Sequence, residues 1–256
     1  MCFPEFYVLM DTPSSWIIFL LAAFGAEIVG TMAGFGAATI LTPVAALFMD
    51  VKCAIALVAI FHLFGNASRL VFFGRRIDWK IWLRFGLTGV VCSLAGAAVA
   101  VRLPSAIIEL SFGIFLLAYV AGSLSSMRLR LRKSSATLMG GGIFSGFIAG
   151  FIGTGGAIRS ACLMVFDLPK EAYIGTSAAI ALVVDATRVP VYLMKQFIPQ
   201  RMFPLIVSLL FAAFLGSWVG QRLIRHVSAE VFRRFVTVML LAMALKMLLD
   251  GSRLFL

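Results

Sequence analysis

Long apolar runs separated by short polar or charged stretches fill almost the whole chain. A membrane-spanning helix needs about 20 apolar residues, because the hydrocarbon core of a bilayer is about 30 Å thick. Eight runs reach this length, with ends that are uncertain by a few residues: 16–48, 53–74, 81–101, 106–123, 138–166, 172–194, 203–223 and 231–249. The pattern predicts an all-α polytopic integral membrane protein without a separate soluble domain.

The amino-acid composition also indicates a membrane protein and excludes other classes of protein. The 256 residues are 62% hydrophobic and 13% charged, whereas a soluble domain is about 45–50% apolar and about 25% charged. Disordered, collagen-like and coiled-coil classes are excluded for the same reason. The net charge of +11 would suggest nucleic acid binding in a soluble chain. Here the basic residues lie in short loops between apolar runs, as they do on the cytoplasmic side of membrane proteins, so the bilayer is the expected partner and nucleic acid is not.

Two of the runs are too long for one simple span. As a single helix, the segment 16–48 would extend about 50 Å, and the segment 138–166 is nearly as long. Glycines interrupt both runs, at 30–36 and at 146–156. Irregular backbone inside a bilayer is tolerated only where it is buried in protein or lines a polar cavity. We predict that each run forms two half-helices joined by a glycine-rich break, which is a sequence sign of a transporter site when it recurs in two repeats.

The two halves of the chain resemble each other. The glycine pattern at 30–36 recurs at 150–156, which is 120 residues later, and Asn66-Ala67-Ser68-Arg69 recurs as Asp185-Ala186-Thr187-Arg188, which is 119 residues later. The segment 94–103 matches 214–223 at the same offset of 120. We therefore predict an N-terminal repeat at 1–123, a basic hydrophilic linker at 124–137 and a C-terminal repeat at 138–256, together forming one transmembrane domain.

Two orientations of these repeats remain open. If each broken run crosses the membrane, each repeat has four crossings and the repeats are parallel; the basic residues outside the spans then divide 12 to 7, with both termini inside. If each broken run is a re-entrant hairpin, each repeat has three crossings and the repeats are inverted; the division becomes 13 to 6, with both termini outside. We favour inverted repeats, because that division is more polarised and the hairpins explain the excess length of the broken runs.

The breaks are candidate anion sites. The second half of a broken helix begins with unpaired N–H groups and the positive end of its dipole, and both favour an anion. The predicted donors are Gly34, Gly36, Thr154, Gly155 and Gly156. The alternative is that these glycines only allow helices to pack closely.

Charged residues inside the spans add to this prediction, because such groups cost several kcal/mol and usually face a cavity or a partner. Arg69 and Arg188 occupy matching repeat positions, and Arg159 follows the second glycine cluster. A guanidinium group suits an oxyanion because it donates several hydrogen bonds in a fixed geometry. Snorkelling to the membrane surface is the alternative for Arg69 and Arg188. The predicted substrate-binding side chains are Asn66, Arg69, Arg159, Asp185 and Arg188.

Three acidic or imidazole groups are candidates for proton coupling, although each is equally suited to a structural hydrogen bond. They are Glu27, His62 and Asp185. The four cysteines are scattered without a CxxC motif, so no metal and no cofactor is predicted. Nucleotide-binding, zinc-protease and serine-hydrolase motifs are absent, and catalytic residues are therefore not predicted and the chain is not expected to be an enzyme.

The paired motifs resemble those of the TauE/SafE sulfite exporter family. They are Gly-x-x-x-Gly-Phe-Gly-Ala at 30–37, Gly-Phe-Ile-Gly-Thr-Gly-Gly-Ala at 150–157, and the Asn/Asp-Ala-Ser/Thr-Arg pair. The resemblance covers nearly the whole chain, including the basic loop between the halves. It implies transport of small sulfur oxyanions or sulfonates, such as sulfite, thiosulfate or sulfoacetate, across a bacterial inner membrane. The first cluster departs from the second because it lacks consecutive glycines.

The sequence as a whole predicts a secondary transporter of a small anion. The anion would bind between the broken helices and cross by alternating access, with a proton as the candidate coupling ion. An anion channel needs a similar positive and polar path, and a non-transporting membrane scaffold subunit is a third class.

Overall fold

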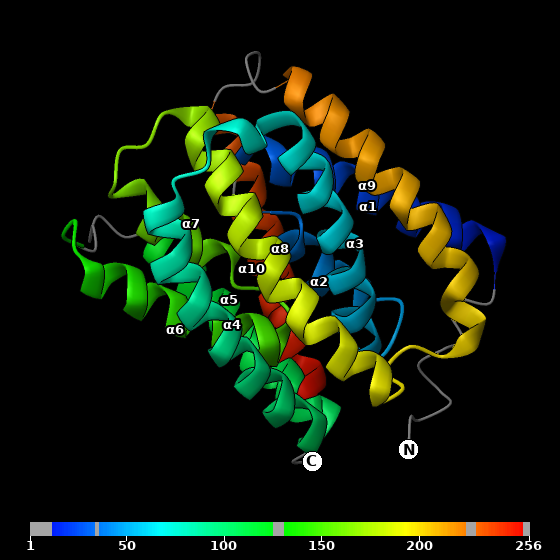
Figure 1. Ribbon diagram of the computed structural model, residues 1–256. Coiled ribbons are helices and arrows are strands. Elements are labelled where there is room, and N and C mark those ends of the chain that lie inside the picture. The colour runs from blue at the N-terminus through cyan, green and yellow to red at the C-terminus, as the bar shows by residue number, and fades with distance from the viewer. Residues whose placement is uncertain (1–11, 34–35, 125–130, 224–228, 253–256) are drawn as a thin grey trace.

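The computed structural model describes residues 12–33, 36–124, 131–223 and 229–252. All regular structure in these ranges is helical, and the helices form one bundle (Figure 1). The α-helices are α1 (Pro13–Ala33), α2 (Ala38–Ala45), α3 (Val51–Phe73), α4 (Trp79–Arg102), α5 (Ser105–Leu124), α6 (Ser135–Ile152), α7 (Gly156–Met164), α8 (Lys170–Met194), α9 (Phe203–Leu223) and α10 (Ala229–Ser252). Two 3₁₀ turns, η2 (Gly74–Arg76) and η3 (Gln200–Met202), precede α4 and α9. The predicted all-α class is confirmed for the described residues.

Seven helices in the described part of the chain are long and apolar enough to cross a membrane. They are α1, α3, α4, α5, α6, α8 and α9 together with its preceding turn. The eighth predicted run also forms a helix, α10, but α10 is not one of these seven. The chain is therefore a polytopic integral membrane protein.

The outward faces of the long helices are apolar. On α4 and α9 the exposed stripe consists of Leu83, Leu87, Val91, Leu94, Phe203, Val207 and Phe211. These residues recur every three or four positions, so they lie along one face of each helix. A continuous apolar stripe of this kind would be a liability in water, and it fits contact with lipid.

Glycines allow α4 and α6 to lie in close contact. Gly142, Gly146 and Gly150 follow one another at intervals of four residues on the face of α6 that meets α4. A Cβ atom added to Gly146 would overlap the backbone carbonyl oxygen of Gly89, and one added to Gly150 would overlap that of Ser93. Small residues at such a contact let the two backbones approach directly.

We expect Gly146→Ala to destabilise the protein and Gly140→Ala, on the same helix, to leave it unchanged or slightly more stable. The added methyl group at Gly146 meets backbone atoms, and overpacking of this kind costs about 1–3 kcal/mol. A Cβ at Gly140 has nothing within 4 Å, and alanine is about 0.5–1 kcal/mol better than glycine in a helix. Unfolding of both variants in detergent measures the difference, and equal stability would contradict the close contact of α4 with α6.

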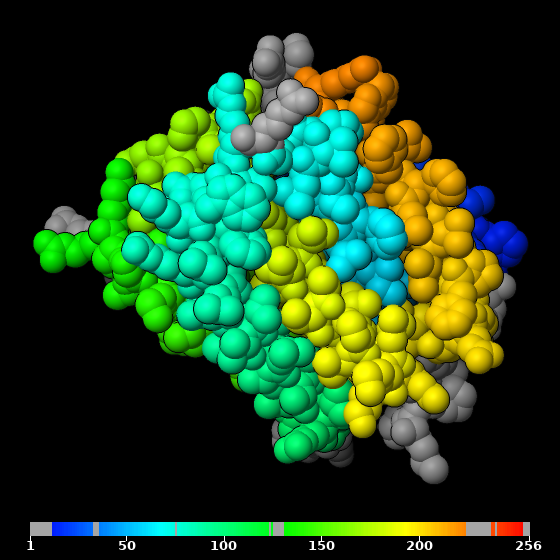
Figure 2. All heavy atoms as spheres, in the orientation of Figure 1, coloured from blue at the N-terminus to red at the C-terminus, as the bar shows by residue number. Residues whose placement is uncertain are grey.

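The helix contacts connect the two halves of the chain. In Figure 2, α8 lies between α3 and α4 on the visible face, and both pairs are in contact. Gly175, near the start of α8, lies against the carbonyl oxygen of Phe73, at the end of α3, whereas His62 meets Asp185 near the middle of both helices. The two helices therefore run antiparallel. Further pairs are α1 with α9, α4 with α6, and α5 with α10.

Candidate anion site between two helix breaks

The first break separates α1 from α2. Gly34, a predicted donor, lies outside the described residues, whereas Gly36 is buried and has φ of +90°, a left-handed conformation that glycine adopts without strain. The Gly36 N–H donates to the carbonyl oxygen of Gly30 at 3.3 Å. Beyond the break the chain returns along α1, since the rings of Phe19 and Phe48 lie 5.8 Å apart. The segment from α1 through α2 is thus a hairpin with one short arm.

The second break, between α6 and α7, has the same form. Gly153 has φ of +87°, and the hydroxyl of Ser145 donates to the carbonyl oxygen of Gly155 at 2.8 Å. A Cβ atom added to Gly141, about three turns before the break, would lie 2.5 Å from the sulfur of Cys162 in α7. The short helix α7 therefore runs back along α6.

The two breaks meet inside the protein. The hydroxyl oxygens of Thr39, in the first turn of α2, and Thr154, just before α7, are 2.7 Å apart, and both residues are buried. Gly155 and Gly156 form the start of α7. The N-terminal ends of α2 and α7, with the unpaired N–H groups and positive dipole ends of their first turns, are thus brought to one place.

A buried ion pair lies beside the first break. The Arg69 guanidinium donates to Oε1 of Glu27 in α1, to the hydroxyl of Thr31 at 3.0 Å and to Oδ1 of Asn66 at 2.9 Å. Ser217 of α9 donates to the same Glu27 oxygen at 2.6 Å. Arg69 is buried, so it does not snorkel to the surface. The predicted residues Glu27, Asn66 and Arg69 form one network across α1, α3 and α9.

A second buried pair holds the other break. Arg188 donates to Oδ1 of Asp185 through Nε at 2.9 Å and Nη2 at 2.7 Å. It also donates to the carbonyl oxygens of Ala149 at 2.5 Å and Gly153 at 3.3 Å, at the end of α6. Arg188 is buried as well. The Ala149 oxygen also accepts from the Gly153 N–H at 3.0 Å, so the guanidinium adds a second donor there and reaches the Gly153 carbonyl just beyond the helix. These hydrogen bonds tie the second break to α8.

Arg159 is the third buried arginine of this region. It lies in α7, and its Nε donates to the hydroxyl of Ser177 in α8 at 2.9 Å. The carboxylates of Glu27 and Asp185 are each already paired with another arginine. The described groups around the breaks therefore comprise three guanidinium groups and two carboxylates, which makes this interior electropositive while His62 is neutral.

His62 connects the two networks. Its Nδ1 lies 2.7 Å from Oδ2 of Asp185, and the Asn66 amide donates to the same carboxylate oxygen at 3.4 Å. Sequence reasoning identified these three residues but missed Ser177 and Ser217. A serine in an apolar helix carries no signal of its partner, because that partner comes from another helix through packing.

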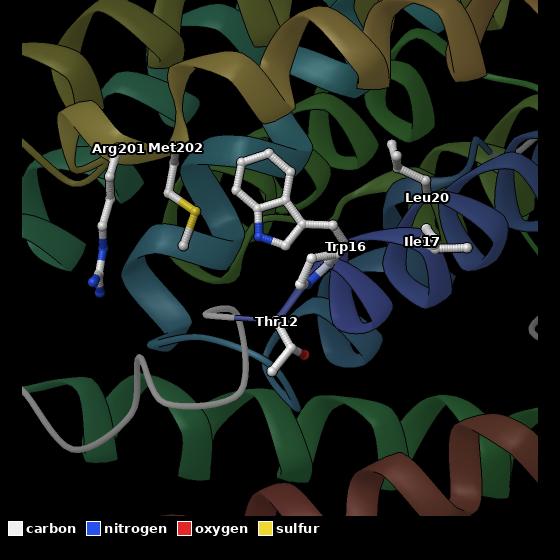
Figure 3. A pocket seen from close by; sticks show the side chains of 7 residues that line it. Thr12, Trp16, Ile17, Leu20, Arg201 and Met202 are labelled. Atoms are coloured by element: carbon white, nitrogen blue, oxygen red, sulfur yellow. The ribbon is translucent and has the colours of Figure 1, made fainter.

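A separate pocket opens at the surface. It has a volume of about 560 Å³ and lies where α1 begins and η3 precedes α9 (Figure 3). Its lining consists of Thr12, Pro13, Trp16, Ile17, Leu20, Arg201 and Met202. None of these residues belongs to the polar networks, whose charged members are all buried. The networks are thus enclosed by protein in this conformation.

Comparison with known proteins gives one family. A family model described as Sulfite exporter TauE/SafE matches residues 19–247. That range includes both breaks, all three buried arginines and His62. No curated protein and no solved structure gives a significant match.

Proposed function

Because the match spans residues 19–247, the chain belongs to the sulfite exporter TauE/SafE family of membrane transporters, and we propose that it is a secondary transporter of a small sulfur oxyanion or organosulfonate. Sulfite, thiosulfate and sulfoacetate are the candidate cargoes, and a bacterial inner membrane is the proposed location. The observation that carries the proposal is the meeting of two helix N-termini at Thr39 and Thr154, beside buried arginines.

The proposed site has the donors that an oxyanion requires. Backbone N–H groups at Gly155 and Gly156, with the hydroxyl of Thr154, would bind its oxygens, and Gly36 would form the turn that brings the start of α2 to the same place. Arg159 would supply the positive charge, because its buried side chain belongs to α7, one turn beyond the second break. We assign Arg69 and Arg188, with Asn66 and Asp185, mainly to holding the breaks in position. We keep Gly34 in the proposed site because it belongs to the same glycine motif at 30–37 as Gly36.

We further infer that the repeats are inverted. The helices α3 and α8 occupy matching repeat positions and run antiparallel, as expected for a two-fold axis in the plane of the membrane. Each short helix returns along the helix before it, which supports re-entrant hairpins. The basic side, by the 13 to 6 division, would face the cytoplasm.

Alternating access fits the enclosed networks better than a channel does. A carrier binds its cargo near the midplane and opens to one side at a time, so a conformation closed around the site is expected. A conducting channel needs a continuous path past its selectivity site. The buried state of every charged group around the breaks therefore favours the carrier.

Anion binding to the purified protein tests the proposal. We expect thiosulfate, sulfite or sulfoacetate to raise the unfolding temperature in detergent, because a ligand at a hundredfold excess over its Kd stabilises the folded state by about 2.7 kcal/mol. Chloride, lactate and taurine serve as comparison ligands. Taurine is a zwitterion, with a positive amino group and a negative sulfonate group. Saturable counter-flow in proteoliposomes then identifies a carrier. Single-channel currents would contradict alternating access, and the absence of binding and flux for every anion would support the scaffold alternative.

A further inference from the structure

His62 lies where α3 crosses α8, and it is only 4% exposed. Its Nδ1 contacts Oδ2 of Asp185 at 2.7 Å, while the other oxygen of that carboxylate accepts two hydrogen bonds from Arg188. An ionised carboxylate only accepts hydrogen bonds. Nδ1 of His62 therefore carries the hydrogen, and in the neutral ring the lone pair is on Nε2.

That second nitrogen faces the first helix break. Nε2 of His62 is buried and has no hydrogen-bond partner among the described residues. A Cβ atom added to Gly36 would overlap it, so Nε2 lies directly against the backbone just before α2. A buried polar atom without a partner is unfavourable, and here it is a basic lone pair beside the proposed anion site.

We propose that His62 is the proton carrier of this transporter and that it takes up one proton on Nε2 when the anion binds. The proposal rests on the proposed function. On uptake, the Nε2 lone pair accepts a proton from hydronium in the solution, which reaches it through the water that enters with the anion, and the ring becomes an imidazolium that still donates through Nδ1 to Asp185. On release, the N–H bond on Nε2 breaks, and proton and anion leave on the same side.

Electrostatics links the two events. The charged groups that surround His62 from its own helix and from the helices packed near it are Asp185, Arg188, Arg69, Arg159 and Glu27. The guanidinium groups repel a further positive charge on the ring, and a bound anion offsets that repulsion. Binding of the anion therefore favours the proton, and the proton favours the anion by the same factor.

The two other candidates for proton coupling have different roles. Glu27 is the counterion of Arg69, and Asp185 is the counterion of Arg188. A proton on either carboxylate would leave a buried guanidinium without its partner, which is strongly unfavourable. Asp185 is instead the positioning residue that fixes the tautomer of His62.

Calorimetry with thiosulfate tests whether anion binding and proton uptake are coupled. Thiosulfate is fully ionised near neutral pH, so any proton taken up on binding goes to the protein and not to the ligand. Binding is measured in two buffers of different ionisation enthalpy, between about pH 5.5 and 8, around the ordinary titration range of histidine. The wild type is expected to take up about one proton for each thiosulfate bound, and its affinity for thiosulfate should rise as the pH falls. His62→Asn keeps an N–H near Nδ1 but cannot take a proton, so its binding should show no proton uptake. Ser68→Ala, at a partly exposed position of α3 whose hydroxyl donates only to the carbonyl oxygen of Phe64 among the described contacts, should match the wild type.

Each further result has a separate meaning. Thiosulfate binding to the wild type without proton uptake at any pH would overturn the role of His62 and leave the proposed function intact. Proton uptake that persists in His62→Asn would also overturn it. Failure of the wild type to bind or move any sulfur anion would contradict the proposed function itself. In proteoliposomes, thiosulfate influx should acidify the lumen, because proton and anion cross together, and an inward proton gradient should accelerate wild-type influx. Alkalinisation of the lumen would contradict the proposal.

Discussion

Replacement of Arg159 by leucine is expected to weaken anion binding at least tenfold and to abolish transport while the protein remains folded. Arg159 is buried in α7 next to the meeting point of the breaks, and its Nε donates to Ser177. A hydrogen bond to a charged group contributes about 1.5–3 kcal/mol, which corresponds to a roughly 10- to 150-fold change in Kd.

Two further variants separate charge, geometry and folding. Arg159→Lys keeps the charge without the planar fork of donors, so we expect weakened but measurable binding. Arg222→Leu makes the same change at an exposed site, where the guanidinium lies 3.6 Å from the ring centre of Trp218, and it should bind and transport normally. Uptake of radiolabelled thiosulfate into proteoliposomes measures transport. Elution as a single species in size-exclusion chromatography measures folding. Wild-type transport by Arg159→Leu would remove this residue from the site.

The apolar pattern predicts the helices well, because the thickness of a bilayer leaves few other solutions. The run predicted at 53–74 is helix α3, Val51–Phe73, and the run at 172–194 is α8, Lys170–Met194. The two overlong runs each contain one long and one short helix. The eighth run gives α10, in which the charged residues Lys246 and Asp250 form an ion pair within the helix.

Contacts between helices are harder to predict, because they depend on how the spans pack. The pair Asp185–Arg188 follows from a spacing of three residues on one helix. The matching position in the first repeat holds Asn66, which has no charge to balance Arg69. The carboxylate comes instead from Glu27 on α1, 42 positions away.

The contact between His62 and Asp185 likewise joins residues that are 123 positions apart in the sequence. No local sequence pattern indicates this contact.

The two predicted repeats therefore differ in the side chains that would do the chemistry. Thr39 stands in the first repeat where Arg159 stands in the second, at the offset of 120 that relates the glycine clusters. His62 has no histidine at the corresponding place in the other half. In the proposed mechanism the charge for the anion comes from one repeat and the proton carrier from the other. The anion and the proton would then meet only when both repeats close around the site.

The Glu27–Arg69 pair should have a much larger effect on stability than any exposed ion pair of this protein. Glu27→Gln leaves the guanidinium of Arg69 in a buried position without its counterion, and loss of one partner of a buried pair costs about 3–5 kcal/mol. Arg69→Met leaves the carboxylate in the same position and should cost a similar amount. In the double variant neither charge remains, so its destabilisation should be smaller than the sum of the single effects by about 1–3 kcal/mol.

The exposed pair Arg76–Glu171 is the matched control. Its atoms are 3.1 Å apart, but the side chains are 67% and 54% exposed, and such pairs contribute about 0–1 kcal/mol. Equilibrium unfolding in mixed micelles, with both cycles measured under the same conditions, compares the two interactions. A small and additive effect at Glu27 and Arg69 would mean that water or lipid headgroups reach the pair. The site between the breaks would then be open in the resting protein, and access to it would not need the movement of one repeat against the other.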